Sequence, residues 1–414
     1  MDASSSSAIA QHTLLSCGLI LAIGTLAAFV ARKIRIPDVA MFLIAGIVLG
    51  PHALGLVNMP AGTALNEIIV LFGASYILFD GGAALRLEVL KKVWITILVL
   101  ATVGVLISAA ITGLAAHFIF GLPPIVALLL GSTIASTDPA TLIPIFRQIK
   151  IRDRVAQTVI SESALNDPMA AILTFALLSA ATGAGQFSLG HSVLALVEQS
   201  VIGIAAGLAF GYLAAVLIAH EKFAFLAEYA PVVTLVAVIG AYFAASGLHA
   251  SGFMAVFVFG VVIGNKESLG FRMEPGEAQR LDEFVLTTSF IMRLFIFILL
   301  GAQVDFAEIR TDGLPAVAVI AVLMLLARPA TVFLCALPDR RARWDLKEML
   351  FMCWTRETGV IPAALAALLL SANAPGAATI ASVTFVAILM TILIQAPTTE
   401  WLARRLGLLE SAGR

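Results

Sequence analysis

The segments Ser136-Thr137-Asp138-Pro139 and Ser161-Glu162-Ser163-Ala164-Leu165-Asn166-Asp167-Pro168 place carboxylates inside otherwise apolar stretches. A charge at the centre of a membrane costs about 2.5–3.5 kcal/mol by insertion scales. A chain keeps such a charge where it has a role, either in a structural ion pair or at an ion or proton site. Because each segment also carries a proline, which interrupts a helix and frees backbone polar groups, the pattern favours an ion or proton site.

The whole chain has the composition of an integral membrane protein. It is 60% hydrophobic and 12% charged, and its mean hydropathy is +1.03, whereas soluble domains are about 45–50% apolar and about 25% charged. Apolar runs of at least about 18 residues recur along it, which is typical of spanning helices and not of barrel strands. We therefore expect an all-α polytopic membrane protein that forms a single transmembrane domain over 1–414, without a soluble domain.

Apolar segments and basic connections together predict the topology. We count thirteen apolar segments, at 14–31, 38–56, 65–84, 93–119, 124–146, 156–182, 191–219, 229–247, 250–265, 284–304, 313–337, 348–371 and 376–403. Lys and Arg gather in alternate connections, so the positive-inside rule predicts an outside N-terminus and a cytoplasmic C-terminus. This orientation requires an odd number of spans, which thirteen satisfies.

Two of these segments carry interruptions in matching positions. The fifth is interrupted at Thr137-Asp138-Pro139 and the twelfth at Arg356-Glu357-Thr358-Gly359, where we expect Arg356 and Glu357 to neutralise each other. Because they are seven segments apart, they run in opposite directions, and segments 1–6 and 8–13 are predicted to be inverted repeats with crossed broken helices. Interrupted helices in matching halves are typical of the midplane site of a secondary transporter.

The polar residues at the first interruption suit an alkali cation. Ser163 and Asp167 are i, i+4 on one helix face, where Thr137 and Asp138 are positioned to meet them. Carboxylate, hydroxyl and carbonyl oxygens suit alkali cations, and the soft or imidazole ligands of transition metals are absent from the motif. A site on Asp167 that holds either a proton or a cation, never both, couples the two flows as an antiporter requires.

Further charges lie within the apolar segments. Arg328 is the leading candidate to pair with Glu162 in a structural tie, because a buried charge needs a partner. Asp80 and Arg293 occupy matching places in the two repeats. Asp80 either lines the cation path or is a paired structural acid, and the structural interpretation is favoured for Arg293.

With these motifs the chain resembles the monovalent cation:proton antiporters of the CPA1 group, the sodium/proton exchangers of the NhaP and NHE type, over nearly its whole length. The Thr-Asp-Pro motif and the Glu-Ser-x-x-Asn-Asp motif at 162–167 are the specific signals. The segment 43–51 resembles the family's second helix, Phe79-Asp80-Gly81-Gly82 its Phe-Glu-Gly-Gly-like third, and 249–253 with 260–265 its ninth.

The resemblance implies a cation shell of Asp167, Asp138, Thr137 and Ser163, in which Asp167 also exchanges the proton. It further implies a homodimer with a dimerisation panel and a mobile core that moves like an elevator. We expect a cell membrane location, and the minimal architecture without a long tail favours a bacterial inner membrane. The implied function is exchange of Na⁺, with Li⁺ as a further candidate, for H⁺ in pH and cation homeostasis.

The resemblance also assigns supporting roles. Asp80 is placed near the entry through water, and Asn166 holds the broken helices in register. Asn in front of Asp167 implies electroneutral exchange of one cation for one proton. The chain departs from the family at Asp80, where Glu is more usual, and at Thr358, which occupies the family's Arg position; Arg356 lies two residues earlier.

Alternatives stay open at this point. A K⁺/H⁺ antiporter or potassium-efflux protein on the same fold uses the same oxygen ligands. An intramembrane aspartyl protease requires a Gly-x-Gly-Asp-like context, which neither Asp138 nor Asp167 has, and a passive channel predicts voltage-driven currents. The expected partners are the cation, protons, the lipid bilayer and a second copy of the chain; no nucleic acid, no cofactor and no enzymatic activity are expected.

Overall fold

The computed structural model describes residues 3–34, 36–60, 62–138, 146, 151–183, 189–220, 223–304 and 306–409. These residues are helical apart from their connections and one antiparallel bridge between Ile151 and Leu409. The α-helices are α1 (Ala3–Ile34), α2 (Asp38–Leu49), α3 (Ala64–Ala83), α4 (Leu87–Ala101), α5 (Val103–Phe120), α6 (Pro124–Thr133), α8 (Asp153–Ala181), α9 (Leu189–Ala219), α10 (Ala230–Gly247), α11 (Gly252–Gly264), α12 (Pro275–Ala302), α13 (Phe306–Val322), α14 (Arg328–Ala336), α15 (Leu346–Trp354), α16 (Val360–Ser371), α17 (Ala377–Met390) and α18 (Ala396–Leu406). Short 3₁₀ turns η1 (Ala227–Tyr229) and η2 (Glu267–Leu269) and π-helical turns η3 (Leu323–Ala327) and η4 (Thr391–Gln395) complete the set.

The helices confirm the all-α membrane fold class. Within the described residues, 9 stretches are long and apolar enough to cross a membrane, and α2, α6, α11 and α16 are shorter apolar helices. Each of the thirteen predicted segments overlaps one of these stretches or shorter helices. Their number as membrane crossings and the orientation of the termini stay predictions.

Several predicted boundaries were wrong. The segment predicted at 38–56 ends as a helix at Leu49, because Gly50 precedes Pro51 and takes an extended conformation (φ −68°, ψ 172°). The segment predicted at 124–146 is helical over Pro124–Thr133, irregular over 134–138 and helical again at Phe146; 139–145 and 147–150 lie outside the described residues.

Three long segments are also locally interrupted. The predicted helix at 93–119 is divided at Thr102 into α4 and α5. The π-helical turns η3 and η4 divide two others, and each is followed by a proline in the first turn of the next helix, Pro329 and Pro397. Because proline has no N–H to donate to the preceding turn, a wider turn at this point accommodates it.

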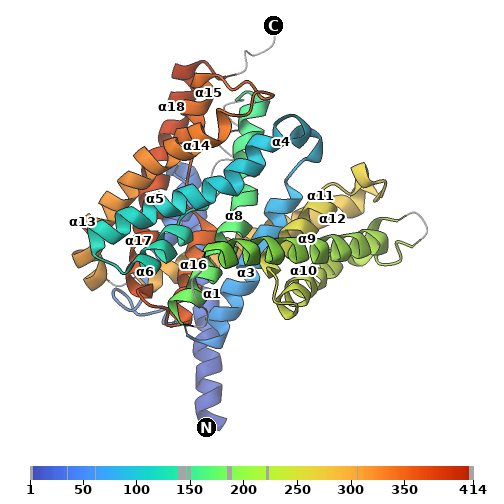
Figure 1. The fold of residues 1–414 in the computed structure, drawn as a ribbon. Coiled ribbons are helices and arrows are strands. Elements are labelled where there is room, and N and C mark those ends of the chain that lie inside the picture. The colour runs from blue at the N-terminus through green and yellow to red at the C-terminus, as the bar shows by residue number, and fades with distance from the viewer. Residues whose placement is uncertain are drawn as a thin grey trace.

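Helix α8 lies centrally between two groups of helices. Figure 1 shows α3 and α9–α12 on one side of α8, and α5, α6, α13 and α17 on the other. Each group has its own apolar core, the first including α2, α3 and α9–α12 and the second α5, α6, α13 and α17. Since α8 contacts both α6 and α11, polar residues on it lie between the two cores.

Glycines allow α3 and α11 to approach closely. A side chain at Gly260 would overlap the Phe79 carbonyl, and one at Gly82 would overlap the Phe257 carbonyl. Small residues at such positions are typical of tightly packed membrane helices. The contact fixes the end of α3 that carries Asp80.

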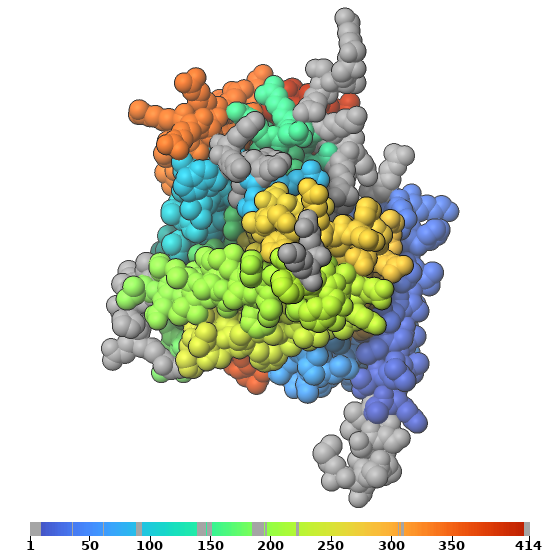
Figure 2. Space-filling model, turned by 90° about the vertical axis from the view of Figure 1, so that its right-hand side faces the viewer, coloured from blue at the N-terminus to red at the C-terminus, as the bar shows by residue number. Residues whose placement is uncertain are grey.

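Helices α9 and α10 present an apolar face to the outside. They cover the middle of the view in Figure 2. Large apolar side chains are exposed on this part of the chain, among them Val201, Tyr212, Leu213, Val236 and Phe243. Such a surface is suited to contact lipid or another protein.

Candidate functional site

Two irregular segments meet at the centre of the site. Residues 134–138 follow α6, and 355–359 separate α15 from α16. The Asp138 N–H donates to the Glu357 carbonyl (2.8 Å). In the second segment, the N–H of Thr358 donates to Thr391 Oγ1 (3.0 Å). These backbone groups, released from helices, are therefore paired inside the protein and not exposed to lipid.

Arg356 fixes the end of α6. Its buried guanidinium donates through Nη2 to the Ile134 carbonyl (3.0 Å) and the Ala135 carbonyl (2.7 Å). The carbonyl end of a helix carries partial negative charge, which a cation stabilises. The expected neutralisation between Arg356 and Glu357 is not made as an ion pair, because the guanidinium is directed to α6 instead.

One polar face of α8 binds the first irregular segment. Ser163 Oγ and Thr137 Oγ1 lie 2.6 Å apart. Asn166 donates from Nδ2 to Thr137 Oγ1 (2.8 Å) and accepts the Thr137 N–H at Oδ1 (3.1 Å). Of the four side chains predicted to meet at the interruption, Thr137 and Ser163 are therefore in contact. Asn166 binds both the backbone N–H and the hydroxyl of Thr137.

Asp138 and Asp167 are buried beside these hydroxyls. Asp138 is 4% exposed and Asp167 6% exposed, and the two carboxylates are close enough for their charges to interact. The Asp167 oxygen Oδ1 receives no hydrogen bond from the described residues. Two carboxylates and two hydroxyls on converging segments form a set of hard oxygen ligands that suits an alkali cation.

Glu162 and Arg328 form a buried, two-pronged ion pair behind this face. Arg328 Nη2 donates to Glu162 Oε2 (2.9 Å), and Nη1 contacts Oε1. Arg328 Nε also donates to the Met352 carbonyl (2.9 Å). The pair joins α8 to α14 and α15, and its role as a structural tie stays a prediction.

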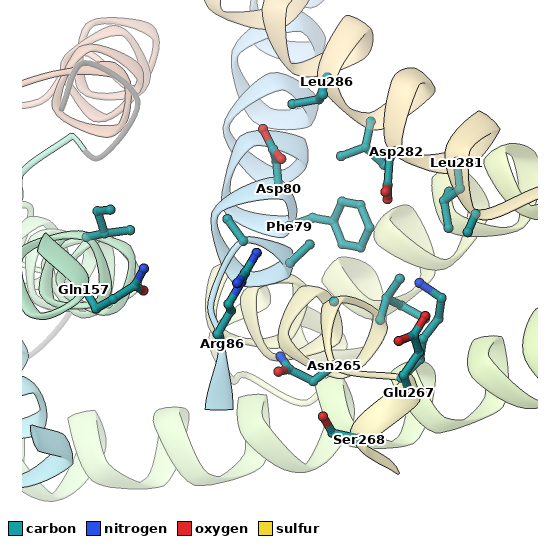
Figure 3. Close-up of a pocket in the computed structure, with 18 of the residues that line it drawn as sticks. Phe79, Asp80, Arg86, Gln157, Asn265, Glu267, Ser268, Leu281, Asp282 and Leu286 are labelled. Atoms are coloured by element: carbon teal, nitrogen blue, oxygen red, sulfur yellow. The ribbon is translucent and has the colours of Figure 1, made fainter. Parts of the chain in front are cut away.

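Asp80 lies on the wall of a cavity whose lining includes neither Asp138 nor Asp167. The cavity has a volume of about 940 Å³ and is bounded by residues of α3, α8, α11 and α12. Figure 3 shows Asp80 and Arg86 with Gln157 and Asp282 around this space. The charges of Asp80 and Arg293 interact, so the structure brings these two predicted residues together.

Sequence reasoning missed the other polar residues of this cavity. The charged and amide side chains that line it besides Asp80 are Arg86, Asp153, Gln157, Asn265, Lys266, Glu267 and Asp282. Most of them lie in or beside the connections rich in Lys and Arg, where their charges were interpreted only as a topology signal. No spacing along the chain indicates that these connections converge.

The sequence of the chain matches a known protein family. The family model described as "Sodium/hydrogen exchanger, transmembrane" matches residues 18–405. The chain belongs to the sodium/hydrogen exchanger family. The resemblance to NhaP-type antiporters of the CPA1 group is thereby confirmed, and the exchanger is a multi-pass cell membrane protein.

Similar proteins and a similar solved structure are also named as cation/proton antiporters. The exchanger is 32% identical over 403 residues to the K(+)/H(+) antiporter NhaP of Alkalimonas amylolytica, covering 94% of this chain and 67% of the relative. It is 32% identical to the probable Na(+)/H(+) antiporter 2 of Methanocaldococcus jannaschii, covering 84% of this chain and 82% of that protein. The structure of the sodium proton antiporter MjNhaP1 from the same organism superimposes with a TM-score of 0.85 at 28% identity, over 95% of this chain and 99% of that one.

Gly359 provides the room for Asp138 in the exchanger. A methyl group built on Gly359 overlaps Cβ, Cγ and Oδ2 of Asp138. The carboxylate therefore lies directly against the second irregular segment, where only a glycine admits it.

We expect Gly359→Ala to displace Asp138 and to lower cation-driven proton movement at least tenfold. Overpacking of this kind costs about 1–3 kcal/mol of stability, so the folded protein is expected to persist. The control is Gly18→Ala, because a side chain there meets no other atom within 4 Å. Equal exchange rates for the two variants in proteoliposomes would show that the contact with Asp138 has no part in transport.

Proposed function

We propose that the chain exchanges a monovalent cation for H⁺, with Asp167 as the carboxylate that holds either ion. Na⁺ is the first candidate and Li⁺ a further one. The observation that carries the proposal is the buried Asp167 carboxylate, whose Oδ1 lacks a hydrogen-bond donor among the described residues, beside Asp138 and the paired hydroxyls of Thr137 and Ser163. A cation or a proton supplies the positive charge that this group lacks, and the two compete for it.

The cavity beside Asp80 supports a route to the site. It lies next to the basic connections that are predicted to be cytoplasmic, and acidic residues on its wall attract cations from solution. In this proposal the protein forms a homodimer, and the inverted repeats with their crossed interrupted helices alternate access by movement of the core. The contact between Asp138 and Glu357 supports the crossing of the two interrupted helices.

Potassium is the second candidate cation. The similarity to the K(+)/H(+) antiporter NhaP of Alkalimonas amylolytica favours K⁺, since that relative aligns with 94% of this chain. The same oxygen ligands bind Na⁺ and K⁺, and selectivity depends on the size and rigidity of the site.

The function is tested in acid-loaded proteoliposomes that contain the purified protein. Addition of Na⁺, Li⁺ or K⁺ outside is expected to drive protons out and to raise the internal pH, and the cation with the lowest KM identifies the substrate. No response to any of the three cations from folded protein would contradict the proposed function.

We expect the exchange rate to be independent of membrane potential. Asn166 stands immediately before Asp167 and carries no charge, so one cation replaces one proton and no net charge moves. The measurement compares initial rates at imposed potentials of opposite sign, set with K⁺ and valinomycin when Na⁺ is the substrate. A rate that rises with one sign of the potential would indicate more than one proton per cation.

A further inference from the structure

Two described connections lead from the first group of helices (α2, α3 and α9–α12) to the α8 group (α4, α5, α8, α13, α14 and α17). Helix α3 packs against α11 and α12, whereas the next helix, α4, packs against α8 and α14. Helix α12 packs against α2 and α3, whereas the next helix, α13, packs against α5 and α17. The connection from α8 back to α9 lies partly outside the described residues. A movement of one group relative to the other therefore changes the backbone at the α3–α4 and α12–α13 connections.

Asn265 binds the first of these connections with its side chain. It directly follows α11 and is 7% exposed, and Figure 3 shows it with Arg86 on the wall of the cavity. Asn265 Nδ2 donates to the Leu85 carbonyl (2.7 Å) and to the Val261 carbonyl in the last turn of α11 (2.8 Å). Its Oδ1 accepts the Leu87 N–H (3.0 Å), which begins α4 and has no partner within that helix. One amide therefore holds both ends of the connection against α11.

Gln303 binds the start of the second connection in a similar way. It directly follows α12, and its Nε2 donates to the Met59 carbonyl (3.1 Å) and to Asn66 Oδ1 (3.0 Å). Met59 lies between α2 and α3, Asn66 lies in the first turn of α3, and both are buried. The start of the α12–α13 connection is therefore held against the first group of helices by a side-chain amide.

The two connections occupy matching places in the predicted repeats. Helices α3 and α11 correspond to the third and ninth predicted segments, and α12 and α2 correspond to the tenth and second. Both pairs pack closely at glycines, since a side chain at any of them would overlap the backbone of the partner helix: Gly260 and Gly264 of α11, and Gly46 and Gly50 at the end of α2. A tight helix pair followed by an amide-held connection therefore occurs twice.

We propose that Asn265 and Gln303 are positioning residues that fix the α3–α4 and α12–α13 connections as two matched hinges, at which the α8 group moves relative to the first group during exchange. This inference rests on the proposed function, because movement of the core is part of it. Each amide holds one end of its hinge against the first group, so the movement is transmitted to α8 and is not lost in local bending of the connection. Neither residue belongs to the candidate cation shell.

The test is Asn265→Ala, which removes all three hydrogen bonds at the first hinge. We expect the maximal exchange rate to fall at least tenfold and the KM for the cation to stay within twofold, because the residues that hold the cation are unchanged. Gln303→Ala is expected to give the same result. The control is Ser251→Ala at the other end of α11, where the buried Ser251 Oγ accepts the Met254 N–H (3.1 Å). It removes a hydrogen bond away from both hinges, and its maximal rate is expected to equal that of the wild type.

A distance measurement tests the hinges without relying on transport. Gln157 of α8 and Leu286 of α12 line the cavity from the two groups, and spin labels are attached there through introduced cysteines after the three native cysteines are replaced by alanine. We expect a broader distribution of label distances in Asn265→Ala and in Gln303→Ala than in the otherwise unchanged protein, because one end of a hinge is released. Ser251→Ala is expected to leave the distribution unchanged.

The outcomes separate the hinges from a purely structural role. Wild-type maximal rates together with unchanged distance distributions in both amide variants would overturn the inference, and so would a rise in KM at an unchanged maximal rate. If the wild type moves no protons, the proposed function fails, while the distance distributions still decide whether the two amides fix the helix groups relative to each other.

Discussion

Asp167→Asn is expected to abolish cation-driven proton movement and to leave the protein folded. The amide has the shape of the carboxylate, but it cannot take up and release a proton and does not supply an anionic oxygen to the cation. Oδ1 of the buried Asp167 accepts no hydrogen bond from the described residues, and an amide oxygen at this position can still accept from Ser136, so few contacts within the protein are lost. Because Asp167 has no ion-pair partner among the described residues and lies near Asp138, removing its buried charge is expected to leave the melting temperature equal to or above that of the wild type.

The measurement is the change of internal pH in proteoliposomes after addition of Na⁺, Li⁺ or K⁺, together with a thermal melt of the same preparation. The matched control is Asp312→Asn, the same chemical change on α13 away from the site, and it is expected to exchange at the wild-type rate. Exchange at the wild-type rate by folded Asp167→Asn protein would remove Asp167 from the mechanism.

Arg328→Ala is expected to destabilise the protein by about 3–5 kcal/mol, because it leaves the Glu162 carboxylate buried without a partner. Both side chains of the pair are 2% exposed, and Arg328 also holds the Met352 carbonyl. Glu162→Ala is expected to have an effect of similar size, since it leaves a buried guanidinium. The joint replacement of Arg328 by Met and Glu162 by Leu removes both charges and is expected to recover much of the loss.

Thermal and denaturant melts in detergent measure the stability of the two single variants and of the double variant, with Arg404→Ala as the control. Arg404 pairs with Glu400 on the surface, where the two side chains are 65% and 48% exposed, and such a pair contributes only about 0–1 kcal/mol. A normal melt for Arg328→Ala combined with a large change in cation KM would show that the pair belongs to the ion site and not to the scaffold.

The sequence alone determined the class of the protein and indicated most members of its candidate site. Apolar runs and alternating basic connections predict a bundle of membrane helices, because lipid leaves no other way to satisfy the backbone. Charged residues in those apolar runs are costly to bury, so each is a candidate for a functional or paired group. The sequence alone therefore identifies Asp138, Asp167, Glu162 and Arg328 as candidates. Helix periodicity places Ser163 on the same face as Asp167, and the proline beside Asp138 predicts an interruption there, so a contact of Ser163 with Thr137 was expected.

Only the tertiary structure decided which groups those charges face. The sequence neighbours Arg356 and Glu357 were expected to pair, yet Arg356 reaches Ile134 and Ala135, more than two hundred positions away along the chain. The cavity beside Asp80 is likewise built from three parts of the chain that are distant in sequence, namely α3, α8 and the consecutive helices α11 and α12. Periodicity reports which face of one helix a side chain occupies, whereas the direction of a side chain in an irregular segment depends on the partners packed around it. For that reason, only the packing of α6, α15 and α16 shows that the buried carboxylate of Glu357 accepts no side-chain hydrogen bond from the described residues.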